Sequence, residues 1–165
     1  MYTASIAEIK RELKERSQNE LIDHCLRLAK FRKENKELLN YLLFEAIDEQ
    51  NYKDELKADI EEQFSEINLS SVYYAKKSIR RILRFVTKHI RYSGIRETEI
   101  ELLICFCRNF RQLSLPFHES KVLINLYDRQ IKNINKALST LDEDLRFDYL
   151  QDIEEISNPL PNLLN

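Results

Sequence analysis

Apolar residues recur at every third or fourth position along most of this chain, which is the spacing of one face of an α-helix. In the first such segment, for example, Ile6, Ile9 and Leu13 share a face. About eight segments can be distinguished in this way, and they cover about residues 5–15, 18–34, 36–49, 52–67, 71–92, 97–113, 119–140 and 142–156. The sequence therefore predicts an all-α fold.

Polar residues mark where several of these helices begin and end. Ser5 with Glu8, and Ser17 with Glu20, fit the S-x-x-E capping box, in which hydroxyl and carboxylate bind free amides at a helix N-terminus. Gly94 follows the fifth segment, where a left-handed residue that ends a helix is expected. The links between helices are short, so we expect consecutive helices to pack as antiparallel hairpins.

The segment at about residues 97–113 differs from the others because it is apolar on nearly all sides. Six consecutive apolar residues, from Leu102 to Cys107, follow the sequence Ile-Glu. A helix of this kind is buried on several sides. We therefore predict a compact array of about eight helices in antiparallel hairpins around this central helix.

The domain organisation expected from these segments is simple. Residues 1–157 are predicted to form a single helical domain, and residues 158–165 a Pro- and Leu-containing C-terminal tail. The tail contains Leu160, Leu163 and Leu164. These leucines could pack back onto the domain or dock on a partner. We expect the former, because an ordered terminus needs such an anchor.

Composition narrows the classes of function that the fold could serve. With 1 Gly among 165 residues, the chain lacks the turns of a β-rich fold and the Gly-rich loops that bind phosphates. The formal net charge of −2 favours neither nucleic acid nor a membrane surface. An odd number of cysteines, 3 in all, is typical of a reducing compartment. Since no apolar signal segment is present, we expect a cytoplasmic protein.

Residue types that catalyse reactions or bind metals are present but lack the spacing that those roles require. Cys105 and Cys107 point about 200° apart on a helix, so they cannot bind one metal ion and are expected to be small core residues. None of His24, His89 and His118 has Glu three residues before it, as a helical di-iron site requires. We expect no cofactor, no metal site and no enzymatic activity.

The charge pattern of the fifth helix is the feature that suggests a function. Residues 71–96 contain eight basic residues and no acidic residue, whereas residues 51–70 contain six acidic and two basic residues. On a helical wheel the basic side chains oppose the apolar face, and aromatic side chains lie at or beside them. The candidate partner or phosphate surface consists of Lys77, Arg80, Arg81, Arg84, Lys88, Arg91, Tyr74 and Phe85.

Three interpretations of this surface remain open. In the first, the basic side chains pair with the acidic helix at about 52–67, in exposed ion pairs that contribute about 0 to 1 kcal/mol each. In the second, they bind an acidic protein partner. In the third, helix 71–93 binds nucleic acid, with basic side chains on phosphates and Tyr74 or Phe85 stacked on bases. The isoelectric point of about 6.0 is low for a dedicated nucleic-acid binder.

Three stretches, made up mostly of residues with the core spacing of helices, carry a resemblance to known proteins. They are Ile9-Lys10-Arg11-Glu12-Leu13 with Glu20-Leu21-Ile22 and Leu26, Tyr41-Leu42 with Tyr52, Leu56, Ile60 and Phe64, and Ala75-Lys76-Lys77 with Ile79 and Ile82. Together they resemble an uncharacterised bacterial family of small all-helical proteins. The resemblance does not cover the C-terminal third, and the family has no assigned activity, cofactor or catalytic residue. The resemblance therefore implies a fold class and no function.

These observations favour a non-enzymatic helical protein-interaction module. Such a module would act through the face of the fifth helix or through a homo-oligomer contact. The alternative is a nucleic-acid-binding protein that uses the basic helix 71–93. The identity of the partner does not follow from the sequence.

Overall fold

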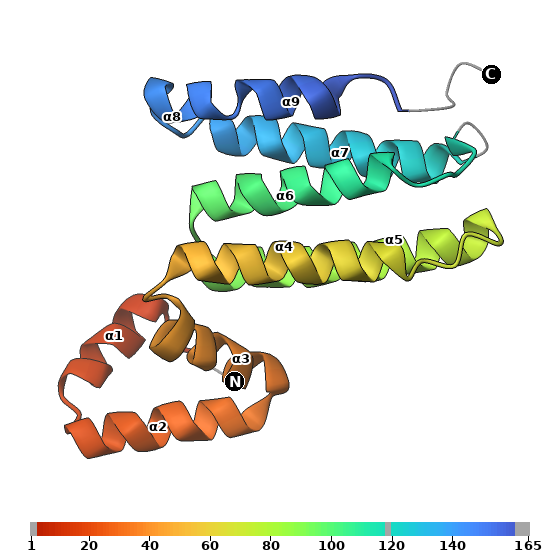
Figure 1. Ribbon diagram of the computed structural model, residues 1–165. Helices are drawn as coiled ribbons and strands as arrows, with labels where there is room; N and C mark the ends of the chain where they lie inside the picture. The colour runs from red at the N-terminus through yellow and green to blue at the C-terminus, as the bar shows by residue number, and fades with distance from the viewer. Residues whose placement is uncertain (1–2, 118–119, 161–165) are drawn as a thin grey trace. The chain divides into compact units, whose positions relative to one another are not determined.

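The computed structural model describes residues 3–117 and 120–160, and all regular secondary structure in these residues is helical (Figure 1). The predicted all-α fold class is confirmed. The chain divides into two compact units, Met1–Ile47 and Asp48–Asn165, which we call unit 1 and unit 2. The predicted single domain over residues 1–157 did not include this division. Amphipathic spacing shows that a helix has an apolar face, but not which helices share a core.

The described part of unit 1 contains three α-helices and a π-helical turn. These are α1 (Ile6–Lys14), α2 (Gln18–Phe31), α3 (Lys33–Asn40) and η1 (Tyr41–Glu45). Both predicted capping boxes are present. The hydroxyls of Ser5 and Ser17 accept hydrogen bonds from the amides of Glu8 and Glu20, and the two carboxylates accept from the serine amides in return.

Few side chains of unit 1 are buried. Among its described residues only Tyr41 is, and α1, α2 and α3 contain no buried residue. Although α2 and α3 contact each other, large apolar side chains on α1 and α2 and in η1 are exposed. Unit 1 therefore has regular secondary structure without a hydrophobic core of its own.

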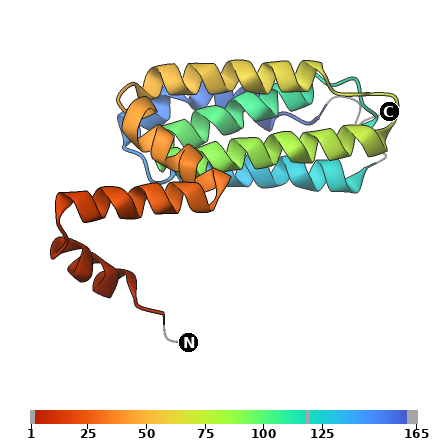
Figure 2. The ribbon, with the colours of Figure 1, turned by 90° about the horizontal axis from the view of Figure 1, so that it is seen from below.

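Unit 2 contains the hydrophobic core. Its described helices are α4 (Glu49–Ser65), α5 (Val72–Ser93), α6 (Arg96–Arg111), α7 (Lys121–Leu138), α8 (Glu143–Asp148) and α9 (Leu150–Ser157). Nine of the 16 residues of α6 are buried, and this helix contacts α4, α5, α7 and α9 (Figure 2). The predicted central position of helix 97–113 is therefore confirmed.

The C-terminal part of unit 2 differs from the prediction in one respect. The predicted helix 142–156 is divided at Tyr149 into α8 and α9. α8 contains no buried residue, whereas α9 buries Ile156 and contacts α6. Of these two helices, only α9 is therefore held in place by packing on α6. Leu160 is buried in the tail. Leu163 and Leu164 lie outside the described residues.

Candidate functional site

Helix α5 has two opposite faces, and its ends are those that the sequence predicts. At its start the Ser71 hydroxyl accepts a hydrogen bond from the Tyr74 amide at 3.4 Å. At its end Gly94, with φ of 67°, donates its amide to the Ile90 carbonyl at 2.9 Å. The fully buried inner face consists of Ala75, Ile79, Ile82 and Val86. Because this packing sets the rotation of the helix, the residues opposite must face solvent.

The residues opposite the inner face form a basic strip along α5. We call the following six residues the basic face: Lys77, Arg80, Arg81, Arg84, Lys88 and Arg91. All are exposed except Lys88, which is half-buried with its Nζ 5.9 Å from the centre of the Tyr92 ring. The structure therefore brings together the basic residues that the sequence predicts to share a surface.

Most of the basic face is not neutralised by the described part of the chain. The residues that take part in no ion pair there are Lys77, Arg80, Arg81, Arg84 and Arg91. Helix α4 packs against α5, yet its Lys53 and Lys57 pair with Glu101 of α6. The first interpretation of the sequence expects ion pairs between α5 and the acidic helix α4. These five side chains do not form them.

The spacing along the basic face is regular. Successive steps of four, three, four and three residues connect Lys77, Arg81, Arg84, Lys88 and Arg91. An average step of 3.5 residues is the repeat at which one helix meets a second helix packed along it. Fourteen residues of α-helix span about 21 Å. The basic face is therefore a straight row of positive charge of about that length.

Aromatic side chains lie beside the basic face, but the two that the sequence predicts to stack on bases, Tyr74 and Phe85, differ in exposure. Tyr74 is 53% exposed and contacts the ring of Tyr73 edge to face, with centroids 5.5 Å apart. Phe85 is half-buried, and its ring centroid lies 4.5 Å from that of His89. The Nδ1 atom of His89 is in turn 2.8 Å from the Tyr52 hydroxyl of α4. Phe85 thus belongs to a cluster that joins α5 to α4, and of the two predicted rings only that of Tyr74 is exposed.

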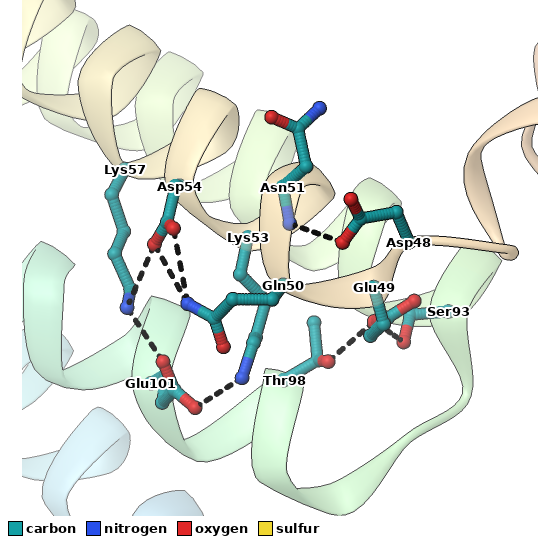
Figure 3. A network of polar contacts seen from close by, with 10 residues as sticks. All are labelled: Asp48, Glu49, Gln50, Asn51, Lys53, Asp54, Lys57, Ser93, Thr98 and Glu101. Atoms are coloured by element: carbon teal, nitrogen blue, oxygen red, sulfur yellow. Dashed lines mark hydrogen bonds and ion pairs between the residues drawn. The ribbon is translucent and has the colours of Figure 1, made fainter.

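Figure 3 shows a polar network between α4 and α6 that sequence reasoning missed. Lys53 Nζ lies 2.6 Å from Oε1 of Glu101, and Lys57 Nζ lies 2.5 Å from Oε2. Burial raises the pKa of Glu101, but hydrogen bonds from the two lysines outweigh it and hold the pKa below its ordinary value of 4.5. The ionised carboxylate therefore fastens α4 to α6. The sequence does contain one indication of this network, because Glu101 is the one charged residue in the apolar segment 100–107.

A second set of hydrogen bonds in Figure 3 joins α4 to the connection between α5 and α6. Glu49 Oε1 accepts from the Ser93 hydroxyl at 2.6 Å and from the Thr98 hydroxyl at 2.5 Å. Thr98 is fully buried, and a buried hydroxyl requires a partner. Since Ser93 ends α5 and Thr98 lies in the first turn of α6, one carboxylate holds three helices.

A pocket of about 510 Å³ opens beside this network. Its lining includes Lys57, Glu101, Cys105, Arg108, Tyr149 and Asp152. A concave site with several titratable groups is what an enzyme would require. Whether the pocket could serve as an active site therefore depends on the protonation and the ion pairs of its lining side chains.

Two of the lining groups, the thiol of Cys105 and the phenol of Tyr149, are neutral at neutral pH. Burial raises the pKa of the Cys105 thiol to about 11 and that of the Tyr149 hydroxyl to about 12. Cys105 is therefore a thiol at neutral pH, whereas nucleophilic attack requires the thiolate. Arg108 is paired with Asp152 at 2.6 Å and with Glu155 at 2.8 Å. We interpret the pocket as bordered by structural ion pairs.

The remaining cysteines and histidines do not form a recognisable site. Cys107 is fully buried, and burial raises its pKa to about 12, whereas Cys25 is exposed. In residues 3–117 and 120–160, no group of three or more His, Cys, Asp or Glu side chains is arranged to hold a metal ion. His118 lies outside the described residues.

Comparison with known proteins adds no relative. No protein-family model, no curated protein and no solved structure matches the chain. The resemblance to an uncharacterised bacterial family therefore stays a prediction. None of the helices in the described residues has the length and apolar character needed to span a bilayer.

Proposed function

We propose that this protein is a non-enzymatic helical interaction module whose basic face binds an acidic surface on a protein partner. The observation that carries the proposal is a group of five exposed cations on the basic face that form no ion pair among the described residues, namely Lys77, Arg80, Arg81, Arg84 and Arg91. Like charges held along one helix repel each other, and the approach of an opposite charge relieves this repulsion. Binding to an acidic surface would therefore be favourable and sensitive to salt.

The spacing of the basic face supports a helix as the acidic element of the partner. Steps of four and three residues along α5 match acidic residues that recur with the same steps on a second, packed helix. Exposed ion pairs contribute about 0 to 1 kcal/mol each, so several of them must act together. A row of about 21 Å allows that.

The surroundings of the basic face favour a protein partner over nucleic acid. The neighbouring helix α4 carries Asp59, Glu61 and Glu62, all exposed and without an ion pair among the described residues. The helix that packs against α5 is thus acidic and the isoelectric point is about 6.0, whereas a domain dedicated to nucleic-acid binding is typically basic overall. Phe85 is one of the two rings expected to stack on bases, and it is half-buried. Its ring therefore offers less surface to a base than an exposed ring would.

The test is a binding titration with a designed probe. A fluorescein-labelled helical peptide of about 21 residues carries Glu at steps of four and three residues, and a second peptide carries Gln at the same positions. Fluorescence anisotropy against the full chain is measured at 50 and 200 mM NaCl. We expect the Glu peptide to bind, the Gln peptide to bind at least about tenfold more weakly, and the binding to weaken with salt.

Two variants distinguish binding at the basic face from attraction by the net charge of the protein. In the first, Lys77→Glu, Arg84→Glu and Arg91→Glu reverse the basic face, and binding of the Glu peptide should be lost. In the matched control, three exposed bases of α7 are reversed by Lys121→Glu, Arg129→Glu and Lys132→Glu, and binding should fall far less.

Equal loss in both variants would show attraction by overall charge and contradict the proposal. Labelled single-stranded DNA, duplex DNA and RNA are titrated in parallel with the peptides. Salt-sensitive binding of any of these, without binding of the Glu peptide, would replace the proposal by nucleic-acid binding.

A further inference from the structure

Unit 1 exposes far more apolar surface than a stable monomeric unit does. Eleven of its large apolar side chains are between 39% and 86% exposed, including Ile6, Phe31 and Phe44. At about 150 Å² for each fully exposed large side chain, they amount to roughly 1,000 Å². This total is spread over several elements of unit 1, and it exceeds the about 300–600 Å² of the largest single apolar patch on a typical soluble monomer. This surface therefore requires a cover.

Helix α1 supplies one half of such a cover. It has nine residues, and its apolar stripe of Ile6, Ile9 and Leu13 contains no buried side chain. Isolated helices shorter than about 12–15 residues are only marginally stable in water, even when their N-terminus is capped as α1 is by Ser5. The stripe must therefore dock onto an apolar surface for α1 to persist.

The other half of the cover lies between α2 and α3. There an open groove of about 240 Å³ is lined by Leu28, Leu38 and Leu42 together with other, mainly apolar side chains. Its polar lining residue, Asn35, donates its amide to the Leu28 carbonyl at 2.9 Å. The groove is thus prepared for an apolar occupant, since no polar side chain in it lacks a partner.

We infer that unit 1 mediates self-association, in which α1 of one copy docks its apolar stripe into the α2–α3 groove of a second copy, and the reverse. The stripe from Ile6 to Leu13 and the side of the groove that α3 and η1 form, from Asn35 to Leu42, each span seven residue steps, or about 10 Å. Ile9 and Leu13 line an open pocket of about 230 Å³ together with His24 of α2, and they stay 42% and 39% exposed there, so α2 of the same copy does not cover the stripe.

Reciprocal exchange accounts for both exposed surfaces with one contact. Because each copy provides one stripe and one groove, a twofold arrangement closes after two chains and leaves neither half open. A standard protein–protein interface buries about 800 Å² on each partner. At about 150 Å² for each fully exposed side chain, the exposed stripe and groove residues Ile6, Ile9, Leu13, Leu28 and Leu42 contribute roughly 420 Å² of apolar surface. This is close to the roughly 500 Å² that an apolar share of about 65% implies for each partner.

The first measurement is the mass of the full chain in solution, by sedimentation equilibrium from 5 to 200 μM. We expect a dimer of twice the 19.8-kDa chain mass. Two variants each remove one half of the contact: a stripe variant, Ile9→Glu with Leu13→Glu, and a groove variant, Leu28→Glu with Leu42→Glu. All four positions are exposed, so each variant should keep its helical circular dichroism while its dissociation constant rises at least about 100-fold.

Mixing the two variants tests the docking itself. The stripe variant keeps an intact groove and the groove variant keeps an intact α1, so an equimolar mixture should form a heterodimer through one of the two contacts. A control variant with Leu145→Glu and Phe147→Glu changes exposed apolar residues of unit 2 and should remain dimeric.

Three results would overturn the inference. A wild-type chain that stays monomeric at 200 μM does not use unit 1 for self-association. Stripe and groove variants that both remain dimeric place the contact elsewhere. Two monomeric variants that fail to associate when mixed contradict the docking of α1 into the groove. None of these results depends on the basic face of α5.

Discussion

Replacement of Glu101 by glutamine should destabilise unit 2 by about 3 kcal/mol at pH 7. The carboxylate lies 2.6 Å from Lys53 Nζ and 2.5 Å from Lys57 Nζ, and the three side chains are 12–30% exposed. A hydrogen bond to a charged group contributes about 1.5–3 kcal/mol. Glutamine retains one neutral acceptor and leaves two ammonium groups close together. The loss in free energy of unfolding should therefore exceed the contribution of a single charged hydrogen bond.

The effect should depend on pH in a defined direction. Burial raises the pKa of Glu101, but the lysines hold it below 4.5 in the folded protein. A carboxyl group with a depressed folded-state pKa stabilises the fold above its unfolded pKa, and this contribution is lost as pH falls through the folded value. The difference between wild type and Glu101→Gln should therefore be largest at pH 6–8 and shrink steadily below about pH 4.

Urea unfolding followed by far-ultraviolet circular dichroism at pH 7, 5 and 3 measures this difference. A matched control is Glu99→Gln on the same helix, whose partner Arg96 lies 2.6 Å away with a side chain 57% exposed. An exposed pair contributes about 0 to 1 kcal/mol, so the control should change little. If Glu101→Gln matches the control to within about 0.5 kcal/mol, or if its effect is independent of pH, the argument from the network is refuted.

Three further predictions concern the end of α5, a buried tyrosine hydroxyl and the three cysteines. Gly94→Ala should cost about 1 kcal/mol in urea unfolding, because φ is 67° and no atom lies within 4 Å of a new Cβ, so the cost is in the backbone alone. Tyr127→Phe should cost about 1–2 kcal/mol in the same assay, because its hydroxyl donates to a carbonyl of α9 at 2.5 Å. In dilute native protein at pH 8, a thiol reagent should titrate Cys25 rapidly and leave Cys105 and Cys107 unmodified until urea is added, since burial raises their pKa values to about 11 and 12.

The parts of the fold that could be predicted from sequence depend on local spacing. The capping boxes at Ser5 and Ser17 and the left-handed cap at Gly94 are present where the sequence places them. The central position of α6 follows from a run of apolar residues too long for one exposed face. These features require only neighbours within one helix or its first turn.

The features that bear on function depend on contacts between residues far apart in the chain. Glu101 meets lysines 44 and 48 positions away, and no local pattern specifies such a pairing. The acidic and basic stretches of α4 and α5 could have neutralised each other, and only the rotation of the packed helices leaves five cations of α5 without an ion pair among the described residues. The stripe of α1 has the same helical spacing as the buried face of α5. Spacing determines that a helix has an apolar face, whereas what covers that face is decided by tertiary packing.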